Sequence, residues 1–340
     1  MVRLGFHRLT RQEHDPSNSS ARGNRVTNTF DASNRLTDVK DQLSNFTTYS
    51  YDAVGNNTVI QDPRGGLITM TYTPGDQLES IRDQIGNPTS YAYDEIGLRF
   101  VRQLASGDLT TYVYDAISRN VSILYADGTR VTFQYDANSN RTTMQDSTGS
   151  TSYAYDALNR MRAKSDPGLL TQTYTYDAAS QRVNLSDPDG GVRTYAYDND
   201  GRNTVYTDPE GNPTTFSYDA AGRKVSYLYL ALLYRSDTFD SAGQLIDRLA
   251  RKGILGSRLQ QSTYDYDAVG NRIWADFGAS LRSTYTYDAK NRLTRDLSSG
   301  TNAHTYDYSY DSCDNRLTST ETGVVTTFNY DLAGRLTTSI

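Results

Sequence analysis

An aromatic residue, usually followed by Asp, returns along this chain at a spacing of mostly twenty-one residues. The series has fifteen members and covers nearly all 340 residues. The aromatic positions are Phe30, Tyr51, Tyr72, Tyr93, Tyr114, Tyr135, Tyr155, Tyr176, Tyr197, Tyr218, Phe239, Tyr266, Tyr287, Tyr310 and Tyr330. A fixed period is typical of a repeat architecture, in which each unit buries its apolar face against its neighbours. Such a chain favours a scaffold over an enzyme with one catalytic site.

The residues after each aromatic indicate a turn. With the aromatic as position zero, position +1 is Asp in every unit but one, which has Thr73. Position +4 is Gly, Asn, Ser or Asp, which adopt a positive φ or make local turn bonds, and an Arg usually follows at +5 or +6. We assign a structural role in the repeat to the residues at zero, +1 and +4, as in Tyr51, Asp52 and Gly55; Tyr93, Asp94 and Gly97; Tyr155, Asp156 and Asn159; Tyr218, Asp219 and Gly222; and Tyr287, Asp288 and Asn291.

The residues before each aromatic indicate a strand. Position −2 is aromatic in most units, and residues two apart lie on one face of a strand. A second turn signal, such as Asp208-Pro209-Glu210-Gly211, lies between one turn and the next aromatic strand. Two short strands and two turns account for about twenty-one residues. The sequence therefore predicts an all-β fold, a ribbon of antiparallel β-hairpins with one hairpin per repeat.

This pattern also predicts the organisation of the chain. Residues 26–340 form the array of about fifteen repeats, with a longer loop at about 248–261. Residues 1–25 are expected to be an irregular segment or a degenerate repeat. The apolar run at residues 227–234 (YLYLALLY) is predicted to be a buried strand. Its eight residues are far short of the ~20 that a membrane-spanning helix needs, so we expect no membrane span.

Composition narrows the possible functions. Apolar residues make up 36% of the chain and Tyr alone contributes 28 residues, so a thick aliphatic core is not expected. A net charge of −6 argues against nucleic acid as a partner. The single cysteine, Cys313, excludes an internal disulfide and a multi-cysteine metal site. His7, His14 and His304 are too scattered for a metal site. We therefore assign no catalytic, cofactor-binding or metal-binding residues.

The motifs resemble those of a known family. The strings Tyr287-Asp288-Ala289-Lys290-Asn291-Arg292-Leu293 and Asp208-Pro209-Glu210-Gly211-Asn212 are similar to the RHS/YD repeat, and the resemblance covers roughly residues 20–340. It implies a hairpin ribbon that spirals into a hollow shell. Such shells enclose the C-terminal toxin of polymorphic toxins and of insecticidal toxin complexes, and related proteins lie on bacterial walls and at animal cell junctions. The resemblance thus implies a secreted or cell-surface scaffold, cytoplasmic before export.

The resemblance does not extend to a toxin. Toxin-bearing members have a core segment after the last repeats with a DPxGL-like motif and aspartates that cleave the chain. Here the nearest string, Asp166-Pro167-Gly168-Leu169, lies within the array and is predicted to be an ordinary turn. We therefore expect neither autoproteolysis nor a toxin segment in these residues.

Strand spacing limits the shell. About thirty strands at ~4.8 Å give a ribbon of roughly 145 Å, which makes about one turn around a toxin of ~130 residues. We expect a partial shell, an open band or cup with two unpaired edges. The expected partners are the remaining shell segments or an enclosed toxin domain, together with self-association through the open sheet edges.

Two alternative interpretations give the repeated side chains a binding role. Exposed tyrosines could stack on sugar rings, which would make the chain a standalone carbohydrate- or cell-surface-binding module; cross-strand packing is the simpler explanation of the tyrosines. The Asp at +1 could bind calcium, but one carboxylate per turn does not supply the six to eight oxygens required. A turn-capping role for Asp is therefore favoured.

Overall fold

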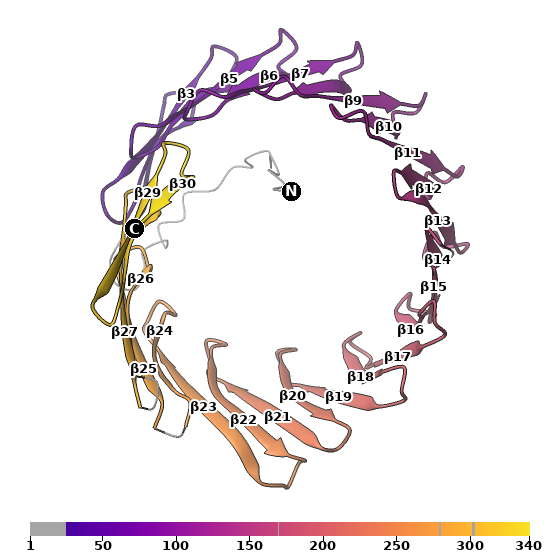
Figure 1. Ribbon diagram of the computed structural model, residues 1–340, viewed down its shortest axis with the longest axis vertical. Coiled ribbons are helices and arrows are strands. Elements are labelled where there is room, and N and C mark those ends of the chain that lie inside the picture. Colours follow the sequence, from indigo (N-terminus) through magenta and orange to yellow (C-terminus); the bar gives the residue numbers. More distant parts are fainter. Residues whose placement is uncertain (1–24, 169, 279, 301–302) are drawn as a thin grey trace. The chain divides into compact units, whose positions relative to one another are not determined.

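The computed structural model describes residues 25–168, 170–278, 280–300 and 303–340. All elements in these ranges are strands, thirty in number (Figure 1). Among the described residues there is no helix of the length and apolar character that a membrane crossing requires. The irregular segment expected at residues 1–25 lies, except for Arg25, outside the described part of the chain.

Each repeat supplies one aromatic strand and one return strand. The aromatic strands all end at the position-zero residue, as the pattern predicted. They are β1 (Thr27–Phe30), β3 (Phe46–Tyr51), β5 (Leu67–Tyr72), β7 (Pro88–Tyr93), β9 (Leu109–Tyr114), β11 (Arg130–Tyr135), β13 (Gly149–Tyr155), β15 (Leu170–Tyr176), β17 (Val192–Tyr197), β19 (Pro213–Tyr218), β21 (Leu233–Phe239), β23 (Arg258–Tyr266), β25 (Arg282–Tyr287), β27 (His304–Tyr310) and β29 (Val324–Tyr330).

The return strands all begin at position +6. They are β2 (Leu36–Lys40), β4 (Asn57–Gln61), β6 (Leu78–Arg82), β8 (Arg99–Gln103), β10 (Asn120–Leu124), β12 (Arg141–Asp146), β14 (Met161–Asp166), β16 (Arg182–Ser186), β18 (Asn203–Thr207), β20 (Lys224–Tyr229), β22 (Leu245–Lys252), β24 (Arg272–Asp276), β26 (Leu293–Ser299), β28 (Arg316–Glu321) and β30 (Leu336–Ser339).

Most strands that follow one another in the sequence pair antiparallel within their unit. In β3 and β4, for example, Ser50 faces Val59 whereas Tyr51 faces Asn57, so one residue of the return strand is left out of the register. The same bulge recurs at the aromatic position in other repeats, such as Ala92/Tyr93 and Ala154/Tyr155. A bulge next to a turn increases the local twist of the pair. The repeat thus adds the same twist at each aromatic position.

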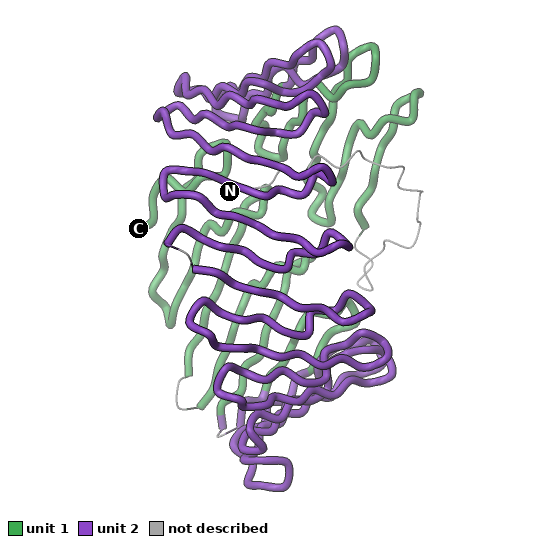
Figure 2. The backbone as a smooth tube through the Cα atoms, turned by 90° about the vertical axis from the view of Figure 1, so that its right-hand side faces the viewer, with its two compact units in different colours: residues 1–69, 265–275, 281–340 green, residues 70–264, 276–280 purple. Residues whose placement is uncertain are grey.

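The chain divides into two units (Figure 2). Unit 1 contains residues 1–69, 265–275 and 281–340, and so joins the first hairpins to the last ones. Unit 2 contains residues 70–264 and 276–280, a run of consecutive hairpins. Among the described pairings, β1 pairs with β2 and β30 pairs with β29, and every residue of β1 and β30 is exposed.

The hydrophobic core is very thin, as the composition predicted. Met70 and Ala275 are the only apolar residues among the described ones that are buried, at 8% and 0% exposure. The other buried residues among the described ones are Gly66 and several Thr and Ser residues, such as Thr151 and Ser262. Most position-zero tyrosines are half-buried. The fold therefore rests on sheet hydrogen bonds and on contacts of half-buried amphipathic side chains.

The apolar run at residues 227–234 is not one strand, so that prediction was wrong. It forms the end of β20, a tight turn and the start of β21, with Leu228 facing Tyr234 and Tyr229 facing Leu233. Leu230 and Ala231 in the turn have φ values of 49° and 56°. Positive φ at both central residues defines the hairpin turn that matches strand twist, and Asn-Gly is its usual sequence. The period imposes a turn here although the residues do not signal one.

The segment at residues 248–261, expected to be a longer loop, is mostly strand. β22 runs to Lys252 and β23 begins at Arg258, so only residues 253–257 connect them. Leu249 faces Gln261 and Ala250 faces Gln260. The additional residues of this repeat therefore lengthen the hairpin, because each new cross-strand pair satisfies backbone groups that a loop would leave to water.

We expect the double change Leu230→Asn with Ala231→Gly to stabilise the protein. A non-glycine residue at positive φ costs about 1–2 kcal/mol, and Asn-Gly relieves this strain at both positions. A rise in the midpoint of thermal unfolding measures the effect. Leu232→Asn, next to the strained positions, is the control and should not raise the midpoint. An unchanged or lower midpoint in the double variant would contradict the strained turn.

Candidate functional site

The turn after each aromatic is held by the carboxylate at +1. In a representative repeat, Asp156 Oδ1 accepts the backbone N–H groups of Leu158 (2.9 Å) and Arg160 (3.0 Å). Its Oδ2 accepts a hydrogen bond from Arg160 Nε at 2.7 Å. The backbone closes the same turn, because Asp156 N–H donates to Arg160 C=O and Asn159 N–H donates to Asp156 C=O. One side chain thus satisfies several donors that a bare turn would leave unpaired.

The residue at +4 adopts a positive φ in every one of these turns. Among the predicted repeat residues, the φ values are 105° for Gly55, 87° for Gly97, 60° for Asn159, 76° for Gly222 and 63° for Asn291. Gly, Asn, Asp and Ser occupy this position because they tolerate the left-handed region or bond locally. The structure therefore places the +4 residues where the sequence pattern expected a turn.

The arginine at +5 reaches into the next repeat. Arg160 Nη1 donates to the backbone carbonyl of Asp177 at 3.1 Å and to Ser180 Oγ at 3.0 Å. Its guanidinium lies over the Tyr176 ring, 4.7 Å from the centroid. Arg35, Arg119, Arg223 and Arg292 make the same bond to the next carbonyl, at 3.0, 3.0, 3.4 and 3.0 Å. The ion pair within one turn is therefore also a bridge between repeats.

The tyrosine at position zero makes the second bridge. Tyr176 hydroxyl donates to the carbonyl of Met161 in the preceding return strand at 2.8 Å. The predicted tyrosines do the same: Tyr51 to Leu36 (2.8 Å), Tyr93 to Leu78 (2.9 Å), Tyr155 to Arg141 (2.9 Å), Tyr218 to Asn203 (2.7 Å) and Tyr287 to Arg272 (2.8 Å). The ring thus packs under an arginine while its polar end is satisfied by the sheet.

A second row of arginines covers the aromatics at −2. The Arg99 guanidinium lies 5.4 Å from the Tyr91 ring centroid and 5.1 Å from that of Tyr112 in the next repeat. Arg141 lies between Phe133 and Tyr153 in the same way, at 5.6 and 4.8 Å. The sequence indicated an Asp–Arg pair but gave no sign that arginines stack between repeats, because the direction of these side chains depends on the register.

In several repeats the turn lowers the pKa of the +1 carboxylate. The pKa of Asp156 is lowered from its ordinary value of 3.8, first by the backbone hydrogen bond from Arg160 and then by its side-chain bond. The same cause lowers the pKa of Asp31, Asp115, Asp198, Asp219 and Asp331, each with the +5 arginine of its own turn. Hydrogen bonds to the charged form favour that form.

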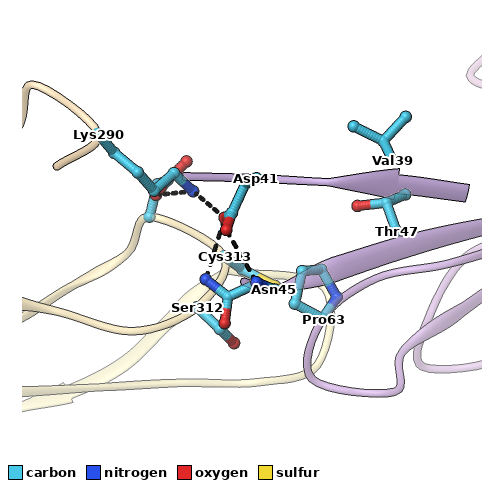
Figure 3. Close-up of a pocket in the computed structure, with 9 residues that line it drawn as sticks. Val39, Asp41, Asn45, Thr47, Pro63, Lys290, Ser312 and Cys313 are labelled. Carbon is cyan, nitrogen blue, oxygen red and sulfur yellow. Dashed lines mark hydrogen bonds and ion pairs between the residues drawn. The ribbon is translucent and has the colours of Figure 1, made fainter. Parts of the chain in front are cut away.

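A seam joins the first hairpins of unit 1 to its last hairpins. Lys290 Nζ lies 3.0 Å from Asp41 Oδ2 and 2.6 Å from Asp314 Oδ1 (Figure 3). Arg64 Nη1 lies 3.3 Å from Asp311 Oδ2, and Arg64 Nη2 donates to the Leu332 carbonyl at 3.0 Å. These are turn residues from opposite edges of the ribbon: 41–45 and 62–66 lie between repeats, whereas 288–292, 311–315 and 331–335 follow an aromatic. No pattern in the sequence predicted this seam.

A small pocket lies at the seam. It has a volume of about 290 Å³ and is lined by Asp41, Asn45, Pro63, Lys290 and Cys313, among others. Figure 3 shows Lys290 and Asn45 both directed at the Asp41 carboxylate. Burial is the largest single effect on the pKa of Asp41 and raises it. The hydrogen bonds from Asn45 and from Lys290 together outweigh burial and lower this pKa to about 2. The pocket is polar and small, and its charges are already paired.

The described residues contain no group of three or more His, Cys, Asp or Glu side chains placed to hold a metal ion. The Asp166-Pro167-Gly168-Leu169 string lies at the end of β14, where Asp166 faces Leu170 and Gly168 has a φ of 87°. Lys164 Nζ pairs with the Asp166 carboxylate at 2.7 Å. This is the geometry of an ordinary turn; Leu169 itself lies outside the described residues.

The fold and the repeated turn define a β-hairpin repeat ribbon of the kind that forms shells. The Teneurin YD-shell family matches residues 3–151, and the RHS Repeat family matches residues 155–192, 176–212 and 197–229. The two matches together show that the chain is built of YD-shell and RHS repeats, which confirms the family and the fold class that the sequence predicted. None of the curated protein sequences is similar enough to count as a match.

Solved structures of TcdB2-TccC3 and of a Tc holotoxin pore have the same fold. TcdB2-TccC3 without its hypervariable C-terminal region matches with a TM-score of 0.81 at 16% identity, over 92% of this chain and 20% of that one. TcdB2-TccC3-TEV matches with a TM-score of 0.80 at 16% sequence identity, and the match also covers 92% of this chain and 20% of that one. The Photorhabdus luminescens Tc holotoxin pore matches with a TM-score of 0.79 at 15% sequence identity, again over 92% of this chain and 20% of that one. This chain spans about one fifth of their length.

We expect Arg160→Ala to destabilise the protein by about 1–2 kcal/mol, because it removes the cation–π contact and the hydrogen bonds to the next repeat. Arg335→Ala is the matched control. Arg335 pairs with Asp331 in the same way at 2.8 Å, but it belongs to the last turn and its side chain is 60% exposed. Its loss should cost no more than about 0.5 kcal/mol. Urea unfolding measures both, and equal losses would contradict the bridging role.

We expect stability to fall in acid. A carboxylate with a lowered folded-state pKa contributes stability that is fully present above its unfolded pKa of about 3.9 and is lost as the pH falls through the folded value. The +1 aspartates whose pKa the turn lowers, such as Asp31, Asp115 and Asp156, act in this direction, so the thermal midpoint should drop as the pH falls below about 4. Asp156→Asn should flatten that slope slightly. A midpoint that is constant over this range would contradict the turn-capping role of the carboxylates.

Proposed function

We propose that this chain is a non-catalytic structural segment of an encapsulating shell, belonging to a secreted or cell-surface polymorphic toxin or to a wall-associated protein. The observation that carries the proposal is the double bridge between repeats. Five arginines at +5 and most tyrosines at position zero bond to a neighbouring repeat, as in Arg160 to Asp177 and Tyr176 to Met161. A sheet one layer thick that is fastened edge to edge in this way is suited to be a wall.

The comparisons support the toxin context of the proposal. The matching structures are named as TcdB2-TccC3 assemblies and a Tc holotoxin pore, and this chain covers 20% of the matched chains. The remaining four fifths of each matched chain lie outside the match. The partners we propose are therefore the remaining shell segments or an enclosed toxin domain, recognised through backbone groups at sheet edges and through turn side chains.

The described contacts do not favour the glycan-binding alternative. Sugar rings stack on free aromatic faces, whereas the Tyr91, Tyr112 and Tyr153 rings are covered by arginine side chains of the same sheet. A glycan-array signal that is lost on changing exposed tyrosines would revive that alternative. Substrate turnover abolished by one point substitution would contradict the non-catalytic role.

We expect the open edge of β30 to drive self-association. Ile340 exchanges both backbone hydrogen bonds with Thr327, so the alternation of an antiparallel ladder directs the N–H of Ser339 away from β29. Ser339→Pro removes that donor and should lower the mass-average size of the protein in light scattering coupled to size exclusion.

The control is Ser339→Ala, which keeps the N–H and should associate like the unchanged protein. A chain that stays monomeric at high concentration without any substitution would contradict association through this edge.

A further inference from the structure

Two basic residues depart from the turn pattern, and both lie at the seam. Most turns of this ribbon share one five-residue form, in which the first residue bonds to the fifth and the fourth bonds back to the first. Lys290 and Arg64 are each the third residue of such a turn. The third residues of the other turns of this form are Ser33, Leu43, Val54, Gly75, Ile85, Ile96, Ser106, Ile117, Asp127, Asn138, Leu158, Ala179, Asp189, Asp200, Glu210, Ala221, Ala242, Val269, Cys313 and Ala333.

Both exceptions are paired across the seam rather than within their own hairpin. Lys290 bonds to Asp41 and Arg64 bonds to Asp311, and the two sequence separations are each close to twelve repeat periods. The side chains are largely covered, with exposures of 14% for Lys290, 17% for Asp41, 19% for Arg64 and 13% for Asp311. Charges this well covered interact more strongly than surface pairs, and losing one partner leaves the other poorly solvated.

We infer that the pairs Lys290–Asp41 and Arg64–Asp311 form a register lock. This lock determines which of the first hairpins of the chain stack on which of its last hairpins. Turns of one form repeat along both edges, so the backbone alone would allow several offsets. The two exceptional side chains distinguish one offset from the others, as charge patterns do in paired helices.

A shift of the seam by one repeat in either direction would bring like charges together. A shift by one repeat in one direction would bring Lys290 onto the turn at 62–66, beside the like charge of Arg64, and would place Asp311 against Ile85. A shift in the other direction would bring Asp311 and Asp314 onto the turn at 41–45, where Asp41 would face them. Like charges juxtaposed in a largely covered contact are destabilising, whereas the observed offset pairs every one of these groups.

The experiment measures the distance between two spin labels in unit 1. Cysteines replace Val54, which is 74% exposed, and Leu317, which is 37% exposed, in a protein where Cys313 is changed to Ala. Neither labelled side chain belongs to the register lock. The unchanged lock should give one narrow distance distribution. Lys290→Gln with Arg64→Gln should broaden it or shift it, while far-ultraviolet circular dichroism shows that the hairpins remain.

A transplanted lock provides the sharper test. Arg64→Ile with Ile85→Arg moves the basic residue by one repeat and leaves Asp62 to receive Lys290. The mean distance should then change by about one hairpin width, ~10 Å. Arg295→Gln is the control, because its pair with Asp307 is exposed and outside the seam; it should change nothing. A distribution that is identical in the unchanged, the double-glutamine and the transplanted proteins would overturn the register lock.

Discussion

The hydrogen bonds that the +1 carboxylate accepts within its own turn are the contacts on which the ribbon depends, and in seven of the fifteen units an arginine at +5 is one of the donors. Asp156 caps its own turn with one oxygen and orients Arg160 with the other. The oriented guanidinium then covers Tyr176 and bonds to the Asp177 carbonyl, at the start of the next turn. Where Thr73 replaces Asp, only one such bond remains, from the Gln77 N–H to the hydroxyl at 3.2 Å. The turn is therefore the element that converts a series of hairpins into one connected sheet.

Much of this fold could be predicted from the sequence because the signals are local. A strand that ends at Tyr51, a cap at Asp52 and a positive φ at Gly55 all follow from residue chemistry within a few positions. Repetition then averages out the ambiguity of any single unit. The family relationship rests on the same residues. The stacking of Arg99 between Tyr91 and Tyr112 could not be predicted, since it depends on the bulge that sets which side chains of neighbouring repeats meet.

Two features of the structure could not be predicted from local residue chemistry, and the causes are opposite. The run at residues 227–234 contains no turn residue, so local chemistry indicated a strand, whereas the register of β20 and β21 places Leu230 and Ala231 in a turn. Here the period outweighs local preference. At the seam, by contrast, the informative residues are those that break the period. Lys290 and Arg64 look like neutral variation in a polar turn until unit 1 brings them to Asp41 and Asp311.

Contacts between adjacent repeats and contacts at the seam have different physical roles. In a repeat sheet with almost no core, the free energy of unfolding is approximately a sum of the contributions of single repeats and of the contacts between neighbouring repeats. None of these contributions specifies which distant repeats meet. The seam joins turns whose positions differ by 268 residues, from Arg64 to Leu332. The entropy of closing such a span grows only slowly with its length, and it is smaller still when the repeats between are already folded. Largely covered ion pairs add little net stability but discriminate strongly against wrong partners. Charge at the seam is therefore best suited to choosing the register, while the turn aspartates and arginines hold the wall together.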